Sequence, residues 1–236
     1  MKQFAIIGIG SFGSRILEEL QQMDTEIIII DKEREIIERY KDNVQAAYIT
    51  DISDGDTLEK VIPQNIDCVI LDLPSNLEVS IIVTNNLKKM GIKNIIVKSD
   101  SDKHGEILKL VGATQIVYPD LEAARRVIPL LVSDNLYNFM PISSGLVMAE
   151  IFLPKKYAGK TLIESNIRYK EGVNIVAIKK DHESEYSFFV PDYKLGAEDI
   201  LLAVGEEDNI KKFTSANADK NTKNITTIMK RLLGNN

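Results

Sequence analysis

The chain has 236 residues, of which 44% are hydrophobic and 6% aromatic, enough for one well-packed domain or two domains of unequal size. Its 35 acidic residues outnumber the 29 basic ones, for a net charge of −6, which argues against binding along a nucleic-acid backbone. No apolar run approaches the roughly 20 residues that span a bilayer, and the N-terminus does not read as a signal peptide. These features predict a soluble, cytoplasmic protein. The single cysteine, Cys68, is predicted to be a small buried hydrophobic residue.

Residues 1–134 alternate short β-branched runs with amphipathic stretches. The predicted strands are Phe4–Ile9, Glu26–Ile30, Gln45–Ile49, Cys68–Leu71, Asn94–Val97 and Gln115–Tyr118. The predicted helices are Phe12–Met23, Glu33–Lys41, Thr57–Val61, Leu77–Met90, Lys103–Val111 and Leu121–Val132. Apolar strands that are each followed by a helix are typical of a parallel sheet covered on both faces, here an α/β doubly wound Rossmann-type fold.

The turn after the first predicted strand reads Gly8-Ile9-Gly10-Ser11-Phe12-Gly13. Glycines at this spacing permit a tight turn, close approach of a pyrophosphate and packing of the next helix on the strand, and the helix N-terminus offers free N–H groups to a phosphate. Asp31 ends the second predicted strand, where a carboxylate accepts both ribose hydroxyls of an adenosine and repels a 2′-phosphate. The pattern predicts a dinucleotide or nucleotide site that disfavours NADP, and the alternative is a Rossmann-like turn that binds nothing.

Polar residues also follow the later strands, and each has a structural and a functional interpretation. Asp51 either reaches the adenine or ribose, or caps the next helix. The loop 72–76 lies over the ligand in the Rossmann plan, with Ser75 or Asn76 expected as a helix cap. Lys98 either neutralises a phosphate at the carboxyl edge of the sheet or is a solvated lysine.

The pattern changes after residue 134. Residues 135–147 are predicted to be a linker or crossover, and residues 148–214 a small α+β lobe. Its predicted strands are Leu146–Leu153, Val173–Lys180, Ser187–Val190 and Ile200–Val204, with helices at Thr161–Asn166 and Asp208–Phe213. Residues 215–236 are expected to be a flexible tail, in which residues 225–233 form at most a short amphipathic helix.

A reaction centre is not evident in the sequence. The two histidines, His104 and His182, are both predicted to be solvated surface residues, and neither belongs to a metal-binding or nucleophilic motif. A dehydrogenase needs a proton donor or acceptor beside the nicotinamide. The sequence therefore favours a regulatory binding protein over the alternative, a small NAD-dependent oxidoreductase; a scaffold with a vestigial Rossmann fold is the third hypothesis.

Three stretches together resemble one family. They are residues 5–13, with the G-x-G-x-F-G pattern; residues 109–119, with Gly112-Ala113 before Tyr118-Pro119; and residues 166–180, with Arg168 and the run Asn174-Ile175-Val176-Ala177-Ile178. The chain resembles the RCK (KTN) proteins, the cytosolic regulatory subunits of bacterial Ktr- and Trk-type potassium uptake systems.

The resemblance implies a subunit that is not an enzyme and that binds an adenine nucleotide, either ATP/ADP or NAD/NADH, in the first lobe. A crossover helix pairs two chains, and the homodimers assemble into an octameric ring on the inner face of a membrane-embedded potassium channel subunit. The expected nucleotide-binding residues are Gly8, Gly10, Ser11, Phe12, Gly13, Asp31, Lys32, Asp51, Ile52, Leu73 and Lys98. Asp120 matches a carboxylate that helps to hold Mg²⁺ or Ca²⁺ at the dimer interface; its alternative role is an N-cap of the crossover helix.

One departure from the family bears on the ligand. Ktr-type members carry an arginine that reaches a γ-phosphate at the position of Ser11, and loss of a charged hydrogen bond costs about 1.5–3 kcal/mol. Arg15, one helical turn further along, is the candidate substitute for this arginine, and ADP, AMP and NAD(H) stay open as ligands.

Some relatives bind cyclic di-AMP between two C-terminal lobes. The matching residues are Ile163, Arg168, Asn174, Ile175 and Pro191. The alternative is that Ile163 and Ile175 belong to the core and that Asn174 satisfies a turn.

Overall fold

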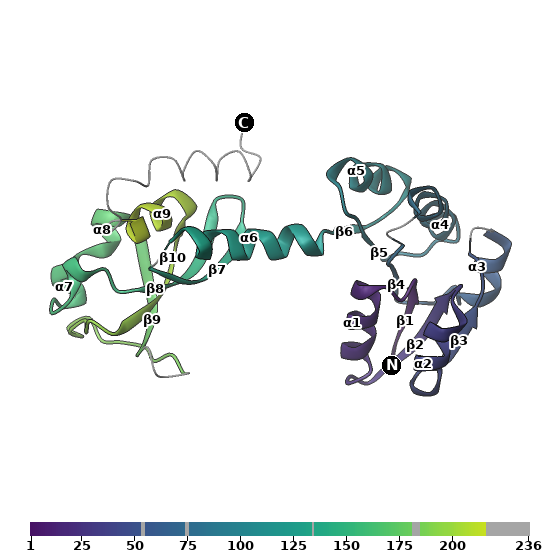
Figure 1. Cartoon of the computed structure of the whole chain (residues 1–236), viewed down its shortest axis with the longest axis horizontal. Helices are drawn as coiled ribbons and strands as arrows, with labels where there is room; N and C mark the ends of the chain where they lie inside the picture. Colours follow the sequence, from purple (N-terminus) through teal and green to yellow (C-terminus); the bar gives the residue numbers. More distant parts are fainter. Residues whose placement is uncertain (53–54, 74–75, 134, 181–184, 216–236) are drawn as a thin grey trace. The chain divides into compact units, whose positions relative to one another are not determined.

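The structure is a computed structural model that describes residues 1–52, 55–73, 76–133, 135–180 and 185–215. The chain divides into two compact units, Met1–Asp120 and the part from Leu121 onward. The first unit is a three-layer α/β sandwich and the second is an α+β lobe built on an antiparallel sheet (Figure 1). The predicted tail helix at 225–233 lies outside the described residues.

The first unit contains a six-stranded parallel sheet in the order β3-β2-β1-β4-β5-β6, which confirms the Rossmann-type prediction. Its strands are β1 (Lys2–Ile7), β2 (Thr25–Asp31), β3 (Ala46–Ile49), β4 (Cys68–Leu71), β5 (Ile95–Lys98) and β6 (Gln115–Val117). Its helices are α1 (Ser11–Leu20), α2 (Arg34–Tyr40), the 3-10 turn η1 (Lys41–Asn43), α3 (Gly55–Val61), α4 (Leu77–Lys89) and α5 (Asp102–Val111).

Alternation along the strands supplies a core to each face of this sheet. In β1, Ile6 packs with α1 and α2 on one face, whereas Ala5 and Ile7 pack with α3, α4 and α5 on the other. Cys68 is buried on the first of these faces, which confirms its prediction as a core residue, and burial raises the pKa of its thiol to about 11. Helices thus cover both faces of the sheet, and open α/β sheets of this kind bind their ligands at the carboxyl ends of the strands.

The second unit is built on a four-stranded antiparallel sheet in the order β7-β8-β10-β9. Its elements are α6 (Pro119–Val132), β7 (Leu136–Ser143), β8 (Leu146–Phe152), the 3-10 turn η2 (Lys155–Tyr157), α7 (Leu162–Ser165), α8 (Ile167–Glu171), β9 (Val173–Lys180), β10 (Asp199–Glu206) and α9 (Glu207–Ser215). Its core includes the rings of Tyr157 and Phe213, whose centroids are 5.8 Å apart and whose planes are inclined by 31°.

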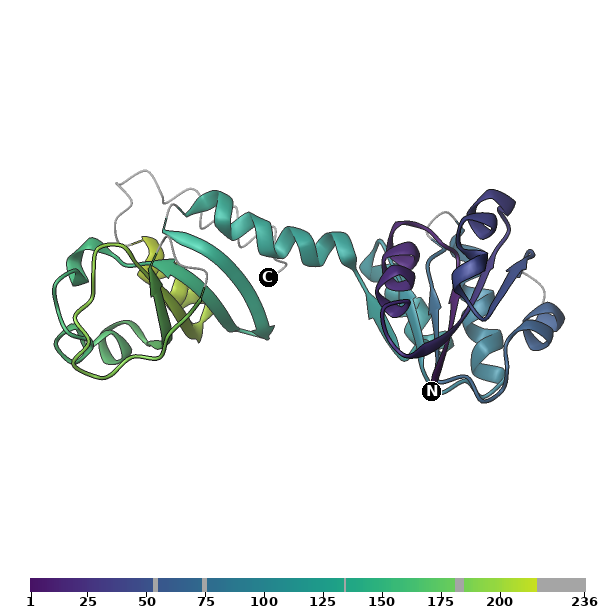
Figure 2. The ribbon, with the colours of Figure 1, turned by 90° about the horizontal axis from the view of Figure 1, so that it is seen from below.

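The sequence prediction of a linker at 135–147 is wrong, because β7 occupies most of that range. Its apolar side chains Leu136 and Phe139 are buried, and β7 pairs with β8 as a hairpin that Figure 2 shows as two adjacent strands. Pro141 is tolerated because β7 is an edge strand, where a missing N–H breaks no ladder. The predicted strand Ser187–Val190 is reduced to an isolated bridge between Ser187 and Ile178, and α8 was not predicted.

Candidate functional site

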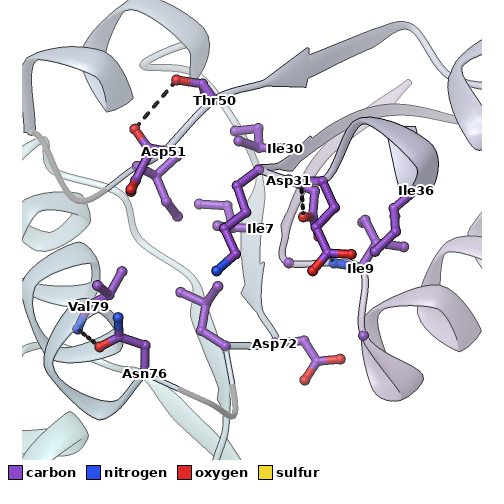
Figure 3. Close-up of a pocket in the computed structure, with 16 residues that line it drawn as sticks. Ile7, Ile9, Ile30, Asp31, Ile36, Thr50, Asp51, Asp72, Asn76 and Val79 are labelled. Carbon is purple, nitrogen blue, oxygen red and sulfur yellow. Dashed lines mark hydrogen bonds between the residues drawn. The ribbon is translucent and has the colours of Figure 1, made fainter. Parts of the chain in front are cut away.

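A pocket of about 230 Å³ opens at the carboxyl edge of the parallel sheet (Figure 3). The strand order reverses between β1 and β4, and a reversal of this kind is where open α/β sheets bind their ligands. The pocket is lined by Ile7, Gly8, Ile9, Gly10, Ile30, Asp31, Lys32, Glu33, Ile36, Thr50, Asp51, Ile52, Asp72, Leu73, Asn76 and Val79.

The turn between β1 and α1 is closed by short contacts that only glycine permits. Gly8 has a φ of +80°, and its N–H donates to the carbonyl of Ile30 at 2.9 Å. A Cβ on Gly13 would stand 2.4 Å from the carbonyl oxygen of Gly8. The turn therefore brings the N-terminus of α1 against the end of β1, as the sequence pattern indicates.

Asp31 fastens this turn to the end of β2. Its Oδ2 accepts a hydrogen bond from the N–H of Ile9 at 2.8 Å, and its Oδ1 accepts one from the N–H of Glu33 at 2.9 Å. Figure 3 shows the carboxylate beside Ile9 on the pocket wall. Because an ionised carboxylate offers about four acceptor positions, Asp31 retains capacity for ribose hydroxyls.

Asp72 is the pocket residue whose role the sequence reasoning missed. It follows β4 directly, and its side chain is fully buried. Its Oδ2 accepts hydrogen bonds from the N–H groups of Phe12 at 3.1 Å and Gly13 at 2.8 Å, in the first turn of α1. The available signal was an aspartate at the end of an apolar strand, and its partners lie 59 and 60 positions away in the sequence.

Lys98 turns toward Asp72. Its Nζ lies 3.7 Å from Asp72 Oδ1 and 3.5 Å from Asp100 Oδ1, and its side chain is only 10% exposed. Asp72 Oδ1 receives no hydrogen bond from the described part of the chain. Lys98 therefore lies between the carboxylates of Asp72 and Asp100, and the interpretation as a solvated lysine is wrong because the side chain is enclosed.

The remaining predicted nucleotide-binding residues fall into two groups. Lys32, Asp51, Ile52 and Leu73 line the pocket with Gly8, Gly10 and Asp31. Ser11, Phe12 and Gly13 belong to the first turn of α1 and are not among the lining residues. Arg15, the candidate substitute for the arginine that Ser11 replaces, forms an exposed ion pair with Glu18 at 2.8 Å.

The residues predicted as helix caps differ in outcome. Asn76 caps α4 by accepting a hydrogen bond from the N–H of Val79 at 3.1 Å, as Figure 3 shows. Ser75 lies outside the described residues. Asp120 is within the first turn of α6 and not in front of it, so it is not the N-cap, although a carboxylate there still favours the helix dipole.

His104 is buried, which corrects the prediction of a solvated residue. It is 7% exposed, with Nε2 2.9 Å from the Ser80 hydroxyl of α4 and Nδ1 3.3 Å from the Ser99 hydroxyl. Burial lowers the pKa of its imidazole, against an opposing effect of Asp100. His104 therefore joins α5 to α4 as a neutral residue, and His182 lies outside the described residues.

Of the residues matched to a cyclic di-AMP site, four belong to α7, α8 and β9, whereas Pro191 lies between β9 and β10. Arg168, Asn174 and Pro191 are exposed. Ile163 is 67% exposed, so its interpretation as a core residue is wrong, whereas Ile175 packs against the core of the second unit. Asn174 is in β9, paired with Val204, and not in a turn.

The part of the chain that the structure describes contains neither a metal-binding cluster nor a membrane-spanning helix. No group of three or more His, Cys, Asp or Glu side chains lies close enough to hold a metal ion. No helix among them is long and apolar enough to cross a membrane.

Comparison with known proteins gives consistent matches. A family model of the TrkA-N domain matches residues 4–119, and one of the TrkA-C domain matches residues 148–217. The chain is 34% identical over 212 residues to the Ktr system potassium uptake protein C of Bacillus subtilis, covering 90% of this chain and 96% of that protein. It is 30% identical over 213 residues to the Ktr system potassium uptake protein A of the same organism, covering 90% and 95%.

Solved structures share the fold. The GsuK RCK domain aligns with a TM-score of 0.61 at 19% identity, covering 90% of this chain and 47% of that chain. The GsuK channel bound to NAD aligns with a TM-score of 0.61 at 18% identity, covering 91% and 39%. The chain thus spans less than half the length of these two structural neighbours.

Proposed function

The chain belongs to the RCK family of potassium uptake proteins, with a TrkA-N and a TrkA-C domain, and from this premise we propose that it is a ligand-gated regulatory subunit. Its relatives are potassium uptake proteins and not enzymes. The prediction that the chain is not an enzyme is therefore confirmed, and the alternative of a small oxidoreductase is set aside.

The pocket in the first unit is the proposed sensor, and its ligand is an adenine nucleotide. The observation that carries this proposal is the joint position of the glycine turn and Asp31 at the reversal of strand order. We expect Asp31 to accept ribose hydroxyls, and Asp51 and Ile52, which line the β3 side of the pocket, to contact the adenosine. One structural neighbour is a channel bound to NAD, which supports NAD(H) beside ATP and ADP among the ligands.

The proposed output is a change in a membrane-embedded potassium channel subunit of the Ktr type, at the inner face of the cell membrane. A ligand shifts such a device only by its differential affinity for two conformations, so no catalytic group is required. We expect homodimers in an octameric ring, with a divalent cation at Asp120 where two chains meet. The exposed Arg168 and Ile163 are available to a cyclic di-AMP site shared by two C-terminal lobes.

Thermal unfolding with ATP, ADP, AMP, NAD, NADH and cyclic di-AMP, each with and without Mg²⁺, tests the proposal. A ligand at a hundredfold excess over its Kd stabilises the folded protein by about 2.7 kcal/mol. D31N should abolish the shift caused by the adenine nucleotide, because an amide accepts poorly from two ribose hydroxyls. D24N removes an exposed carboxylate outside the pocket and is the matched control.

Two results would contradict the proposal. The sensor is refuted if none of these nucleotides shifts the unfolding temperature of the wild-type protein. The site assignment alone is refuted if D31N binds the same nucleotide as tightly as D24N does.

A further inference from the structure

Asp72 occupies the place where a Rossmann turn ordinarily binds a phosphate. In that fold the free N–H groups at the start of the first helix point at the ligand's pyrophosphate. Here the N–H groups of Phe12 and Gly13 both donate to Asp72 Oδ2. An internal anion therefore already satisfies the donors that a phosphate would use.

The glycines of the turn are fitted to Asp72. A Cβ on Gly10 would stand 2.6 Å from Asp72 Oδ2, and a Cβ on Gly8 would stand 2.1 Å from the Asp72 carbonyl oxygen. The second glycine of this motif ordinarily gives a pyrophosphate room to approach the backbone. In this chain the absence of a side chain at Gly10 makes room for the Asp72 carboxylate.

The charge of the residues that line the pocket also disfavours a bound phosphate. Four of its lining residues are acidic, namely Asp31, Glu33, Asp51 and Asp72, and one is basic, Lys32. A volume of about 230 Å³ is also below the roughly 300–1,000 Å³ of pockets that enclose a drug-sized ligand. The pocket is thus suited to the neutral adenosine portion of a nucleotide, and poorly suited to a phosphate over the glycine turn.

We propose that Asp72 is a specificity-determining residue of this pocket, which keeps phosphate groups from the N-terminus of α1 and makes the pocket bind adenine compounds through their adenosine portion. This inference rests on the proposed adenine-nucleotide function. Phosphate groups of a bound nucleotide then point to solvent, or bind at the turn only after displacing the carboxylate. The predicted consequence is weak discrimination among adenosine, AMP, ADP and ATP.

Calorimetric titration of the full-length protein with adenosine, AMP, ADP and NAD tests this assignment. Wild type should bind adenosine at least as tightly as ADP. D72A should raise the affinity for ADP and NAD tenfold or more, because two amides become free for a phosphate and a like charge is removed. The affinity for adenosine should change less than about threefold.

Two further variants isolate the cause. D72N keeps the shape that holds α1 against β4 and removes only the charge, so it should give a smaller gain for ADP and covers the case in which D72A folds poorly. D100A removes the other carboxylate beside Lys98, at 3.5 Å from its Nζ, without freeing the amides. It should leave the preference between adenosine and ADP unchanged.

The outcomes separate this inference from the proposed function. If wild type binds ADP at least tenfold more tightly than adenosine and neither D72A nor D72N changes that ratio, the role of Asp72 is refuted and the nucleotide site stands. If no adenine compound binds wild type or either folded variant, both the site and the role of Asp72 are refuted.

Discussion

Adding one methyl group at Gly10 tests whether Asp72 is what excludes a side chain there. In G10A the new Cβ would stand 2.6 Å from Asp72 Oδ2, so the carboxylate must withdraw from the N–H groups of Phe12 and Gly13. Overpacking costs about 1–3 kcal/mol and a hydrogen bond to a charged group contributes about 1.5–3 kcal/mol. With partial relaxation we expect G10A to lower the free energy of unfolding of the first unit by about 2–4 kcal/mol.

The same substitution should behave differently once the carboxylate is gone. Gly10 has a φ of −74°, a conformation that alanine adopts without strain. In the D72A background, G10A should therefore be neutral or stabilise the first unit by up to about 1 kcal/mol, through a less flexible unfolded chain. The double-mutant cycle then gives a coupling of several kcal/mol between positions 10 and 72.

The single cysteine makes the assay specific to the first unit. Cys68 is buried in β4 and its pKa is raised to about 11, so a thiol reagent reaches it only when that unit opens. Pulse labelling across a urea gradient, in wild type and the three variants, gives the free energies. G8A is the matched control, because its Cβ meets the Asp72 backbone and its φ is +80°; it should destabilise in both backgrounds. Equal costs of G10A with and without Asp72 would refute the reasoning.

Two further predictions concern residues outside the pocket. Burial holds the pKa of His104 below its ordinary value of 6.5. As the pH falls, this histidine therefore takes up a proton in the unfolded chain before it does so in the folded protein. The free energy of unfolding of the first unit should therefore decline below about pH 6.5, less so in H104Q; identical pH profiles for H104Q and wild type would contradict this. In the second unit, F213A removes a fully buried ring and should cost about 3–5 kcal/mol in urea unfolding followed by circular dichroism. F188A, at a side chain that is 88% exposed, should change stability by less than about 0.5 kcal/mol, and similar losses for the two would show that α9 is not part of the core.

The sequence predicts the architecture of the first unit well because its signals are local. Apolar runs flanked by turn residues define strands such as β4, predicted with the same bounds that the structure gives. The glycine turn and Asp31 fix the position of the pocket for the same reason, since both lie at the ends of consecutive strands. The hairpin strand β7 is not evident in the sequence because only Leu136 and Phe139 of its side chains are buried, and the stretch from Pro141 to Gly145 is typical of a linker.

Only the tertiary structure, by contrast, decides which group binds to the N–H groups at the glycine turn between β1 and α1. The sequence by itself determined that Gly8, Gly10 and Gly13 would bring the start of α1 close to the end of β1, since that depends on local backbone geometry. The sequence shows an aspartate at the end of β4, but not that its carboxylate accepts hydrogen bonds from the N–H groups of Phe12 and Gly13. Parallel pairing aligns Ile7 of β1 with Leu71 of β4, so the next residues of both strands meet at the sheet edge, and that pairing across the intervening helices is a property of the folded sheet alone.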